Sequence, residues 1–306
     1  MARQGPVRSF VELAVAWPVL QALAWLPLPA ARGLAESLAA LVYRFTPRWR
    51  GIGERNLQIA FPEASAAERE RILRGSYSNL GRVLLALARL PRLNERNIGD
   101  WIANEGFGHY EQALSHGRGV IFLTAHLGCW ELSSAAHALF GNPMHVMVRS
   151  LDNPRLDRLI DRRRTLFGNR TIRKQNAAKA VLSALRANEA VGVLADQNAA
   201  GDDGVFVDFF RVPASATKGV AQLASRGGAA VIPGFAFWNE KDGRYVLKFY
   251  PPVELVESGD RDADVQENTG RCQAAIERAI REYPDQWLWI HRRWKRRPEG
   301  SPPLYE

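Results

Sequence analysis

The second half of the chain alternates short apolar runs with amphipathic stretches, and this alternation limits the folds open to it. Helices are expected over 153–168, with Pro154 in the first turn, and over 178–188 and 216–228. Such alternation is typical of a central sheet of largely parallel strands. The predicted fold class is therefore α/β, with a mixed, largely parallel sheet flanked by helices. The predicted strands lie in "GVIFLT", "MHVMVRS", "AVGVLAD", "AAVIPGFAFW" and "RYVLKFYPPVEL".

The N-terminal region raises the question of a membrane. Residues 10–28 read "FVELAVAWPVLQALAWLPL", 19 residues with Glu12 as the one charge. A helix of this length reaches about 28 Å, close to the hydrocarbon thickness of a bilayer. Pro18 and Gln21 weaken a simple spanning helix. Three interpretations stay open: a cleaved signal peptide, a core helix, and a retained anchor that either spans the bilayer or lies in its interface.

Two long helices are expected outside the alternating region. Residues 64–90 repeat apolar residues at helical spacing, and Ser65 with Glu68 three residues later forms the pattern of a capping box. The last long helix is expected over 262–283. The first of the two is interpreted as scaffold.

The stretch "TAHLGCWEL" places His126 and Glu131 just after a predicted strand, where sites gather in α/β sheets. On a continuous helix the two side chains would point about 140° apart. They meet if His126 lies on a loop and Glu131 in the first helical turn, and Gly128 permits the unusual backbone this needs. A carboxylate holding one imidazole nitrogen leaves the other to take a proton from a hydroxyl. The alternative is that Glu131 only complements the helix dipole.

Other polar residues fall at the ends of neighbouring predicted strands. Arg149 closes one strand and Asp196 closes another. The arginines between them indicate either a solvated helix face or a pocket for phosphate and other acidic groups. Asp196 either orients an arginine or caps a loop. The arginines of the intervening helix are Arg158, Arg162, Arg163 and Arg164.

Two aromatic stretches have both an ordinary and a functional interpretation. In 204–219, Phe206, Phe209 and Phe210 favour core packing or an apolar slot for a hydrocarbon chain. In the tail "DQWLWIHRRWKRRP", tryptophans alternate with cations, a pattern typical of a membrane interface or of single-stranded nucleic-acid binding. His291 is interpreted as a packed or surface histidine. The tail tryptophans are Trp287, Trp289 and Trp294.

The charge balance points to acidic partners. The 41 Lys+Arg residues exceed the 32 Asp+Glu residues and give a net charge of +9. Nucleic acid, an anionic membrane and an acidic protein are the candidate classes. Cys129 and Cys272 form neither a disulfide framework nor a metal-binding spacing. No glycine-rich nucleotide-binding motif is present in the sequence.

The blocks of sequence, taken in order, resemble the late acyltransferases of lipid A biosynthesis, the lauroyl/myristoyl transferase family of Gram-negative bacteria. The resemblance covers nearly the whole chain. It is carried by "ERNLQIAFPE", "GRGVIFLTAHLGCWEL", "VRSLDNPRLDRLIDRRRTLFG", "LADQNAAGDDGVFVDFFRVPASATKG" and "WLWIHRRWK".

This resemblance implies a fold like that of glycerolipid acyltransferases, with a membrane-anchoring segment over 1–46 and an acyltransferase domain over 47–306. It implies transfer of a fatty acyl group from acyl carrier protein to a hydroxyl of an acyl chain on a lipid A precursor. The protein would lie at the inner membrane with its active site at the cytoplasmic face. No cofactor or metal and no nucleic-acid partner is expected.

The resemblance also assigns roles to the residues at the strand ends. His126 matches the family's catalytic base and Glu131 its partner. Arg164 and Asp196 match further functional positions, with Arg162 as the alternative register, and together with Arg149 they are expected to bind substrate. Cys129 departs from the pattern, but direct attack by a hydroxyl needs no acyl-cysteine step. Two rival functions remain: acylation of another glycolipid, such as a phosphatidylinositol mannoside, and a membrane-associated nucleic-acid-binding module.

Overall fold

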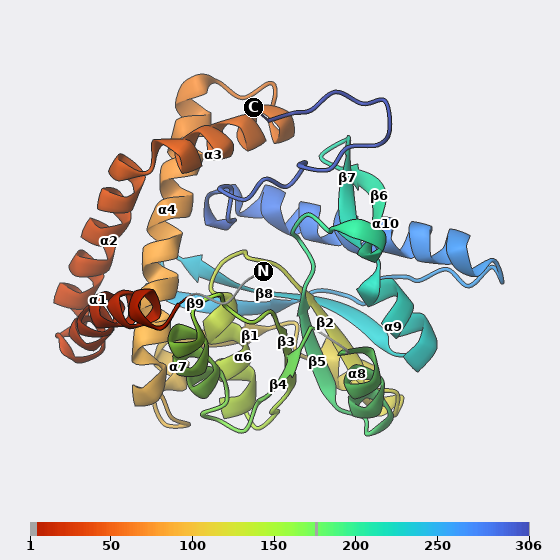
Figure 1. The fold of residues 1–306 in the computed structure, drawn as a ribbon. Coiled ribbons are helices and arrows are strands. Elements are labelled where there is room, and N and C mark those ends of the chain that lie inside the picture. Colours follow the sequence, from red (N-terminus) through yellow and green to blue (C-terminus); the bar gives the residue numbers. More distant parts are fainter. Residues whose placement is uncertain (1–4, 175–176, 306) are drawn as a thin grey trace.

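A seven-stranded sheet of order β1-β9-β8-β2-β5-β3-β4 runs through the middle of the molecule (Figure 1). This computed structural model describes residues 5–174 and 177–305. Within them the neighbouring strands of the sheet are parallel except β8 and β9, which confirms the predicted fold class. The strands are β1 (Ile102–Glu105), β2 (Val120–Thr124), β3 (His145–Val148), β4 (Arg170–Arg173), β5 (Ala190–Leu194), β8 (Ala230–Asn239) and β9 (Arg244–Phe249).

Strand β2 lies at the centre of the sheet and is buried on both faces. Ile121 and Leu123 belong to one core cluster, whereas Val120 and Phe122 belong to the other. A strand enclosed in this way reads as a continuous apolar run, which is why the sequence revealed it. Two helices, α5 (Gly108–Ser115) and α6 (Trp130–Leu139), cover the face of Phe122. The other face carries α8 (Ala177–Arg186), α9 (Gly219–Gly227) and α10 (Arg261–Glu282).

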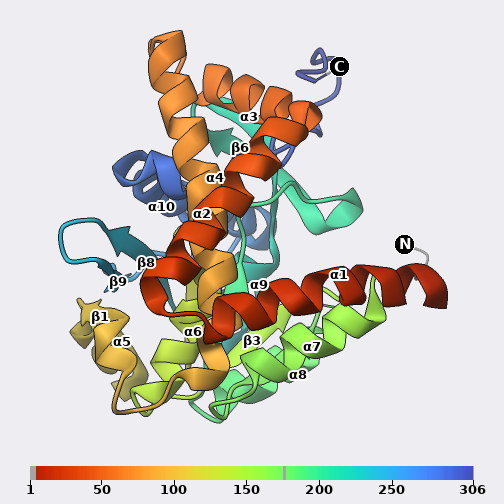
Figure 2. The same cartoon turned by 90° about the vertical axis from the view of Figure 1, so that its left-hand side faces the viewer.

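Four helices precede the sheet and stand beside it (Figures 1 and 2). The N-cap of the fourth is Ser65, whose hydroxyl accepts from the Glu68 N–H at 3.1 Å, as the capping pattern predicted. The second and fourth helices pack side by side, and the first lies across them. The bounds are α1 (Pro6–Trp25), α2 (Leu28–Phe45), α3 (Pro47–Ala60) and α4 (Ala66–Arg89); a further helix, α7 (Pro154–Arg164), lies between α1 and α6.

The aromatic stretch over 204–219 forms a two-stranded hairpin, β6 (Gly204–Phe209) and β7 (Val212–Thr217). Its turn residues, Phe210 and Arg211, both have positive φ, at 53° and 61°. Phe209 and Phe210 are buried in the core, while Phe206 is exposed. Core packing is therefore the correct interpretation for Phe209 and Phe210.

The C-terminal segment corrects the interpretation of the tail as a surface for membrane or nucleic acid. Trp287, Trp289 and Trp294 are all buried, with at most 1% of each side chain exposed. Arg293 is buried as well and donates to the Ser215 carbonyl at 2.7 Å and to Gln273 Oε1 at 3.0 Å. The tail closes over the β6–β7 hairpin and α10, so its indole rings serve the core. Short 3-10 turns lie at Leu90–Arg92, Ile98–Asp100, Gly201–Asp203 and Pro284–Gln286.

Candidate active site

The loop after β2 holds His126 at the C-terminal edge of the sheet. Gly128 takes a φ of +62°, and a Cβ there would lie 1.9 Å from the Ala236 carbonyl oxygen, so this position requires glycine. The His126 carbonyl accepts from the Leu288 N–H at 3.0 Å. Asn79 on α4 donates to the Gly128 carbonyl at 2.9 Å. These three contacts fix the conformation of the loop without any contribution from a substrate.

Asp196 is the carboxylate that holds His126. Thr124 of β2 pairs with Leu194 of β5, so the residues two positions beyond each strand end lie opposite one another. One carboxylate oxygen of Asp196 lies 2.9 Å from His126 Nδ1, and the other accepts from the His126 backbone N–H at 3.0 Å. The indole N–H of Trp287 donates to that second oxygen at 2.8 Å.

The charge state of Asp196 fixes the tautomer of the imidazole. Asp196 is 1% exposed. Burial alone would raise its pKa, but the His126 ring and the donors from His126 and Trp287 lower it to about 2. An ionised carboxylate only accepts hydrogen bonds, so Nδ1 of His126 carries the proton and Nε2 presents a lone pair. Within residues 5–174 and 177–305, no hydrogen bond to Nε2 is formed.

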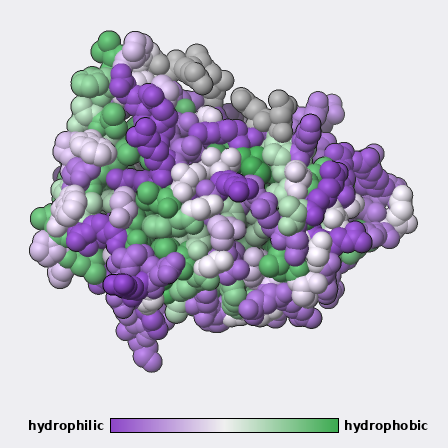
Figure 3. Space-filling model, turned by 90° about the horizontal axis from the view of Figure 1, so that it is seen from below, coloured by the Kyte–Doolittle hydropathy of each residue, from purple (hydrophilic) through white to green (hydrophobic). Residues whose placement is uncertain are grey.

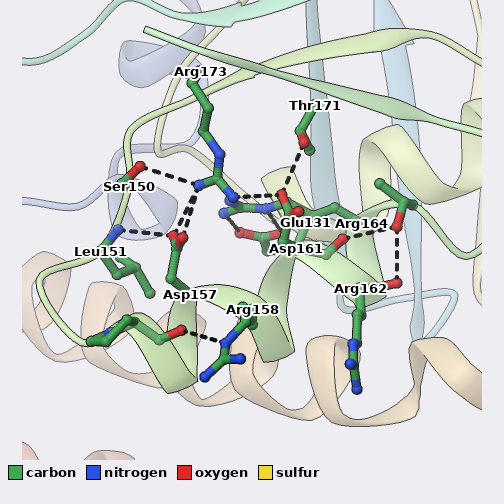
Figure 4. A network of polar contacts seen from close by, with 12 residues as sticks. Glu131, Ser150, Leu151, Asp157, Arg158, Asp161, Arg162, Arg164, Thr171 and Arg173 are labelled. Carbon is green, nitrogen blue, oxygen red and sulfur yellow. Dashed lines mark hydrogen bonds and ion pairs between the residues drawn. The ribbon is translucent and has the colours of Figure 1, made fainter. Parts of the chain in front are cut away.

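Glu131 does not pair with His126, which corrects the expected contact. Glu131 does lie in the first turn of α6, and His126 does lie on the loop. Both oxygens of Glu131 accept from Arg164, one from Nε at 2.9 Å and one from Nη2 at 2.5 Å (Figure 4). The first turn of α6 points this carboxylate toward α7, whereas the loop turns the imidazole toward the neighbouring strand β5. Burial alone would lower the pKa of Arg164, but Glu131 raises it above its ordinary value.

The arginines of α7 have separate surroundings. Arg164 makes the contact with Glu131, Arg163 is buried and donates to the Leu87 carbonyl, and Arg162 is exposed and extends away from the network (Figure 4). Of these three arginines, Arg164 is the one that contacts Glu131. Arg149 lies on the surface just after β3. Arg173 at the end of β4 bridges Asp157 and Asp161 of α7 at 3.0 and 3.2 Å.

His291 lies close to the site but performs a structural task. Its Nε2 accepts from the Asn198 N–H at 3.0 Å, which steadies the loop that carries Asp196. Burial lowers the pKa of His291 to about 4 against the opposing charge of Asp196, so the ring is neutral at pH 7. Burial likewise raises the pKa of the Cys129 thiol to about 12. A thiol that stays protonated is a poor nucleophile, consistent with no role for Cys129 in the transfer.

A cavity lies between α6 and the sheet. Trp130 lines it, and the centre of its ring lies 5.1 Å from that of the His126 ring. The volume of the cavity is about 40 Å³. His137, two turns further along α6, lines it as well. The remaining lining residues are Phe122, Thr124, Ser133, Ser134, Met144, Val146, Gly192, Leu194, Gly234, Leu247 and Phe249.

His137 is a buried polar side chain in the lining of this mainly apolar cavity. Its ring packs between those of Tyr110 and Phe122, each with a centroid 4.9 Å away. Nδ1 hydrogen-bonds the Asn142 carbonyl, and Nε2 is buried without a partner among the described residues. Burial lowers the pKa of His137 to about 4, so it is neutral at pH 7.

Comparisons with known proteins show what the chain as a whole is similar to. A family model described as "Bacterial lipid A biosynthesis acyltransferase" matches residues 8–296. The lipid A biosynthesis lauroyltransferase of Escherichia coli K12 is 29% identical, over 97% of this chain and 94% of the relative. The palmitoleoyltransferase of the same organism is 28% identical over the same shares, and the myristoyltransferase is 26% identical over 91% and 88%. The match therefore includes both the N-terminal helices and the sheet edge that carries His126.

Proposed function

The chain belongs to the family of bacterial lipid A biosynthesis acyltransferases, and on this premise we propose that it moves a fatty acyl group from acyl carrier protein to a lipid A precursor. The acceptor group is a hydroxyl of an acyl chain already attached to the precursor. The enzyme is an acyltransferase by family, and the carrier-protein donor and the acceptor position are the finer parts of the proposal.

The hydrogen bond between His126 Nδ1 and Asp196 carries the mechanistic proposal. It leaves Nε2 to take the proton of the acceptor hydroxyl as the oxygen attacks the thioester carbonyl carbon. The tetrahedral intermediate then expels the carrier thiolate, which recovers the proton from Nε2. The products are the new ester and the free thiol of the carrier. Asp196 orients His126 and stabilises the imidazolium that forms, a different role from the substrate contact expected from the sequence.

Trp287 supports this pair as a positioning residue. Its indole N–H gives Asp196 a donor that does not come from His126, and its ring is buried. The carboxylate is thereby held in one orientation while His126 Nε2 takes up and releases the proton. A carboxylate fixed by several donors needs little rearrangement as charge develops, which favours the transition state.

Glu131 and Arg164 form a second charged pair beside the base. We propose that this largely buried ion pair holds the first turn of α6 against the last turn of α7. Because Glu131 neutralises Arg164, the role of this pair is to position the two helices rather than to contact acidic substrate groups.

The cavity under α6 is the proposed slot for the donor acyl chain. Its lining is mainly apolar and includes Trp130, whose ring lies 5.1 Å from that of His126, where the thioester carbonyl must lie. The cavity of about 40 Å³ must widen as the chain enters. A flexible hydrocarbon chain gains free energy on leaving water for such a slot. The acidic carrier protein suits a chain of net charge +9. The proposed location is the inner membrane, with the active site at the cytoplasmic face.

The test is an acyl-transfer assay with purified full-length protein. Thioesters of acyl carrier protein with several chain lengths are offered with a lipid A precursor or, in parallel, with a phosphatidylinositol mannoside, and products are identified by mass spectrometry. We expect transfer to the lipid A precursor and a loss of roughly 10²-fold or more in His126→Ala. The exposed His116 serves as the control, and His116→Ala should keep full activity. Transfer only to the other glycolipid, or near-normal turnover by folded His126→Ala, contradicts the proposal.

A further inference from the structure

Helix α1 presents an apolar face to the outside of the molecule. Among the described residues it is the one helix long and apolar enough to cross a membrane. Val7 and Val15 are 76% and 67% exposed, and Phe10 is 58% exposed. In Figure 3 hydrophobic residues stand among hydrophilic ones along the left-hand edge of the molecule. Exposed apolar side chains gathered on one helix favour a partner that is itself apolar.

The opposite face of α1 is tied to the body near both ends. Close to the N-terminal end, Asn153 at the start of α7 donates to the Ser9 carbonyl at 3.1 Å and to Glu12 Oε2 at 2.9 Å. At the C-terminal end, Arg89 of α4 donates to the Leu23 carbonyl at 3.0 Å and also to the Leu26 carbonyl.

Packing adds to these bonds along the rest of the helix. Leu20 and Leu23 are buried against Ala35 of α2 and against Leu85 and Ala88 of α4. Helix α1 thus lies along the protein for its whole length rather than projecting from it.

A spanning orientation conflicts with these contacts. A helix of 20 residues is about 30 Å long, as thick as the hydrocarbon layer itself. If α1 stood across the bilayer with its contacts intact, α7 would enter the hydrocarbon beside it, with Arg155, Asp157 and Arg158 among its side chains. Charged side chains at that depth are strongly unfavourable.

An orientation in the plane of one leaflet satisfies the same observations. Figure 2 looks onto this side of the molecule, where α1 runs across the view and α2 rises obliquely from the C-terminal end of α1, both in front of α4. The outward surfaces of the two helices thus share one side. The junction of α2 and α3 adds more exposed apolar residues to this side: Leu41, Val42, Phe45 and Trp49.

Cations accompany the apolar residues, as expected for an anionic lipid surface. Arg8, Arg44 and Arg48 are exposed on α1, α2 and α3. The guanidinium of Arg155 lies 5.8 Å from the centre of the exposed Phe10 ring. Basic residues close to a bilayer strengthen binding through attraction to anionic headgroups. This mixture is typical of an amphipathic helix that lies in the interface.

We infer that α1 is an in-plane anchor: together with the α2–α3 junction it docks on one leaflet of an anionic bilayer, and both ends of α1 remain on the side of the acyltransferase domain. This orientation rests on the proposed membrane location and specifies how α1 lies in the bilayer. Asn153 begins α7 against α1, and Arg164 ends α7 against Glu131. One helix therefore separates the lipid surface from the catalytic edge of the sheet, which brings the site close to an acceptor that resides in the leaflet.

Cysteine labelling tests the topology in the full-length protein. Cys129 and Cys272 are buried, so a membrane-impermeant maleimide should react mainly with an introduced thiol. Gly5→Cys marks the start of α1, and Ser115→Cys marks the exposed end of α5. In right-side-out and inverted membrane vesicles, we expect both thiols to be labelled from the same side. Labelling from opposite sides, or labelling of Gly5→Cys only after detergent is added, overturns the in-plane orientation.

Flotation with vesicles tests docking separately from topology and from the reaction. We expect the purified protein to float with vesicles of phosphatidylglycerol and to float less with vesicles of phosphatidylcholine. Val11→Glu with Val15→Glu on the outer face should reduce flotation at least tenfold, whereas Gln112→Glu on α5 should not. Undiminished flotation of the double variant contradicts the docking face. Failure of the wild type to float contradicts membrane docking itself and leaves the acyl-transfer assay in solution unaffected.

Discussion

Replacing Trp287 by phenylalanine tests how Asp196 is held. The change removes one N–H donor to an ionised, buried carboxylate and keeps most of the ring. Hydrogen bonds to charged groups contribute about 1.5–3 kcal/mol. His126 still supplies Asp196 with two donors, so we expect the fold to survive.

Trp289→Phe is the matched control for this experiment. Trp289 is as buried as Trp287, lies 4.6 Å from it between ring centres, and donates to a neutral acceptor, the Pro284 carbonyl. Both variants lose the same side-chain volume. A neutral hydrogen bond contributes about 1 kcal/mol, so the two variants should differ in stability by roughly 1 kcal/mol.

Activity should separate the two variants more clearly than stability does. We expect kcat to fall roughly tenfold in Trp287→Phe, equivalent to about 1.4 kcal/mol, and to stay within about twofold of the wild type in Trp289→Phe. A carboxylate with one donor fewer attracts the imidazolium more strongly, so the acid limb of kcat/KM should move to higher pH in Trp287→Phe alone. The measurement is a pH–rate profile of acyl transfer for the wild type and both variants. Equal losses in the two variants, or an unchanged profile in Trp287→Phe, refute the positioning role.

Three further predictions concern the surroundings of the site. Glu131→Gln removes the partner of the largely buried Arg164 charge, so chemical denaturation should show a loss of about 3–5 kcal/mol. Glu131→Gln with Arg164→Met should largely recover this loss. Glu267→Gln in the exposed pair with Arg271 should cost under about 1 kcal/mol, and equal costs would contradict this. Gly192→Ala places a Cβ 2.9 Å from Met144 Cε in the cavity and should shift the preferred donor toward shorter acyl chains. Gly227→Ala is the control: its Cβ lies equally close to Leu185 but outside the cavity, so the chain-length profile should stay unchanged. The pKa values of His137 and His291 are about 4 in the folded protein and about 6.5 in the unfolded chain, so the unfolded state gains protons first as the pH falls. The free energy of unfolding should therefore fall as pH drops from 6.5 to 4, by about 2 kcal/mol per histidine at pH 5. A flat denaturation midpoint across this window would contradict the prediction.

The sheet could be predicted from the sequence because β2, β5 and β8 are buried on both faces and read as apolar runs. The partner of His126 could not be predicted in the same way. Asp196 reaches His126 only because β5 lies next to β2 in the sheet, with Thr124 opposite Leu194. Local spacing favoured Glu131, which is five residues away, over a carboxylate that is 70 residues away and brought close by strand order.

The tail and the hairpin could not be predicted for different reasons. Alternating tryptophans and arginines suit a membrane interface, but here α10 and the β6–β7 hairpin enclose the rings, and burial is a property of the whole fold. The hairpin itself lacks a glycine or asparagine at its turn, since Phe210 and Arg211 adopt positive φ instead. Neither feature has a local signal in the residues that form it.

The most direct test of the catalytic pair is a double-mutant cycle on acyl transfer, with kcat measured for His126→Ala, Asp196→Asn and the double variant. If Asp196 acts through His126, each single change should lower kcat by roughly 10²-fold or more, and the double variant should be no slower than the slower single variant. Losses that multiply in the double variant, or near-normal turnover in folded Asp196→Asn, would contradict the account.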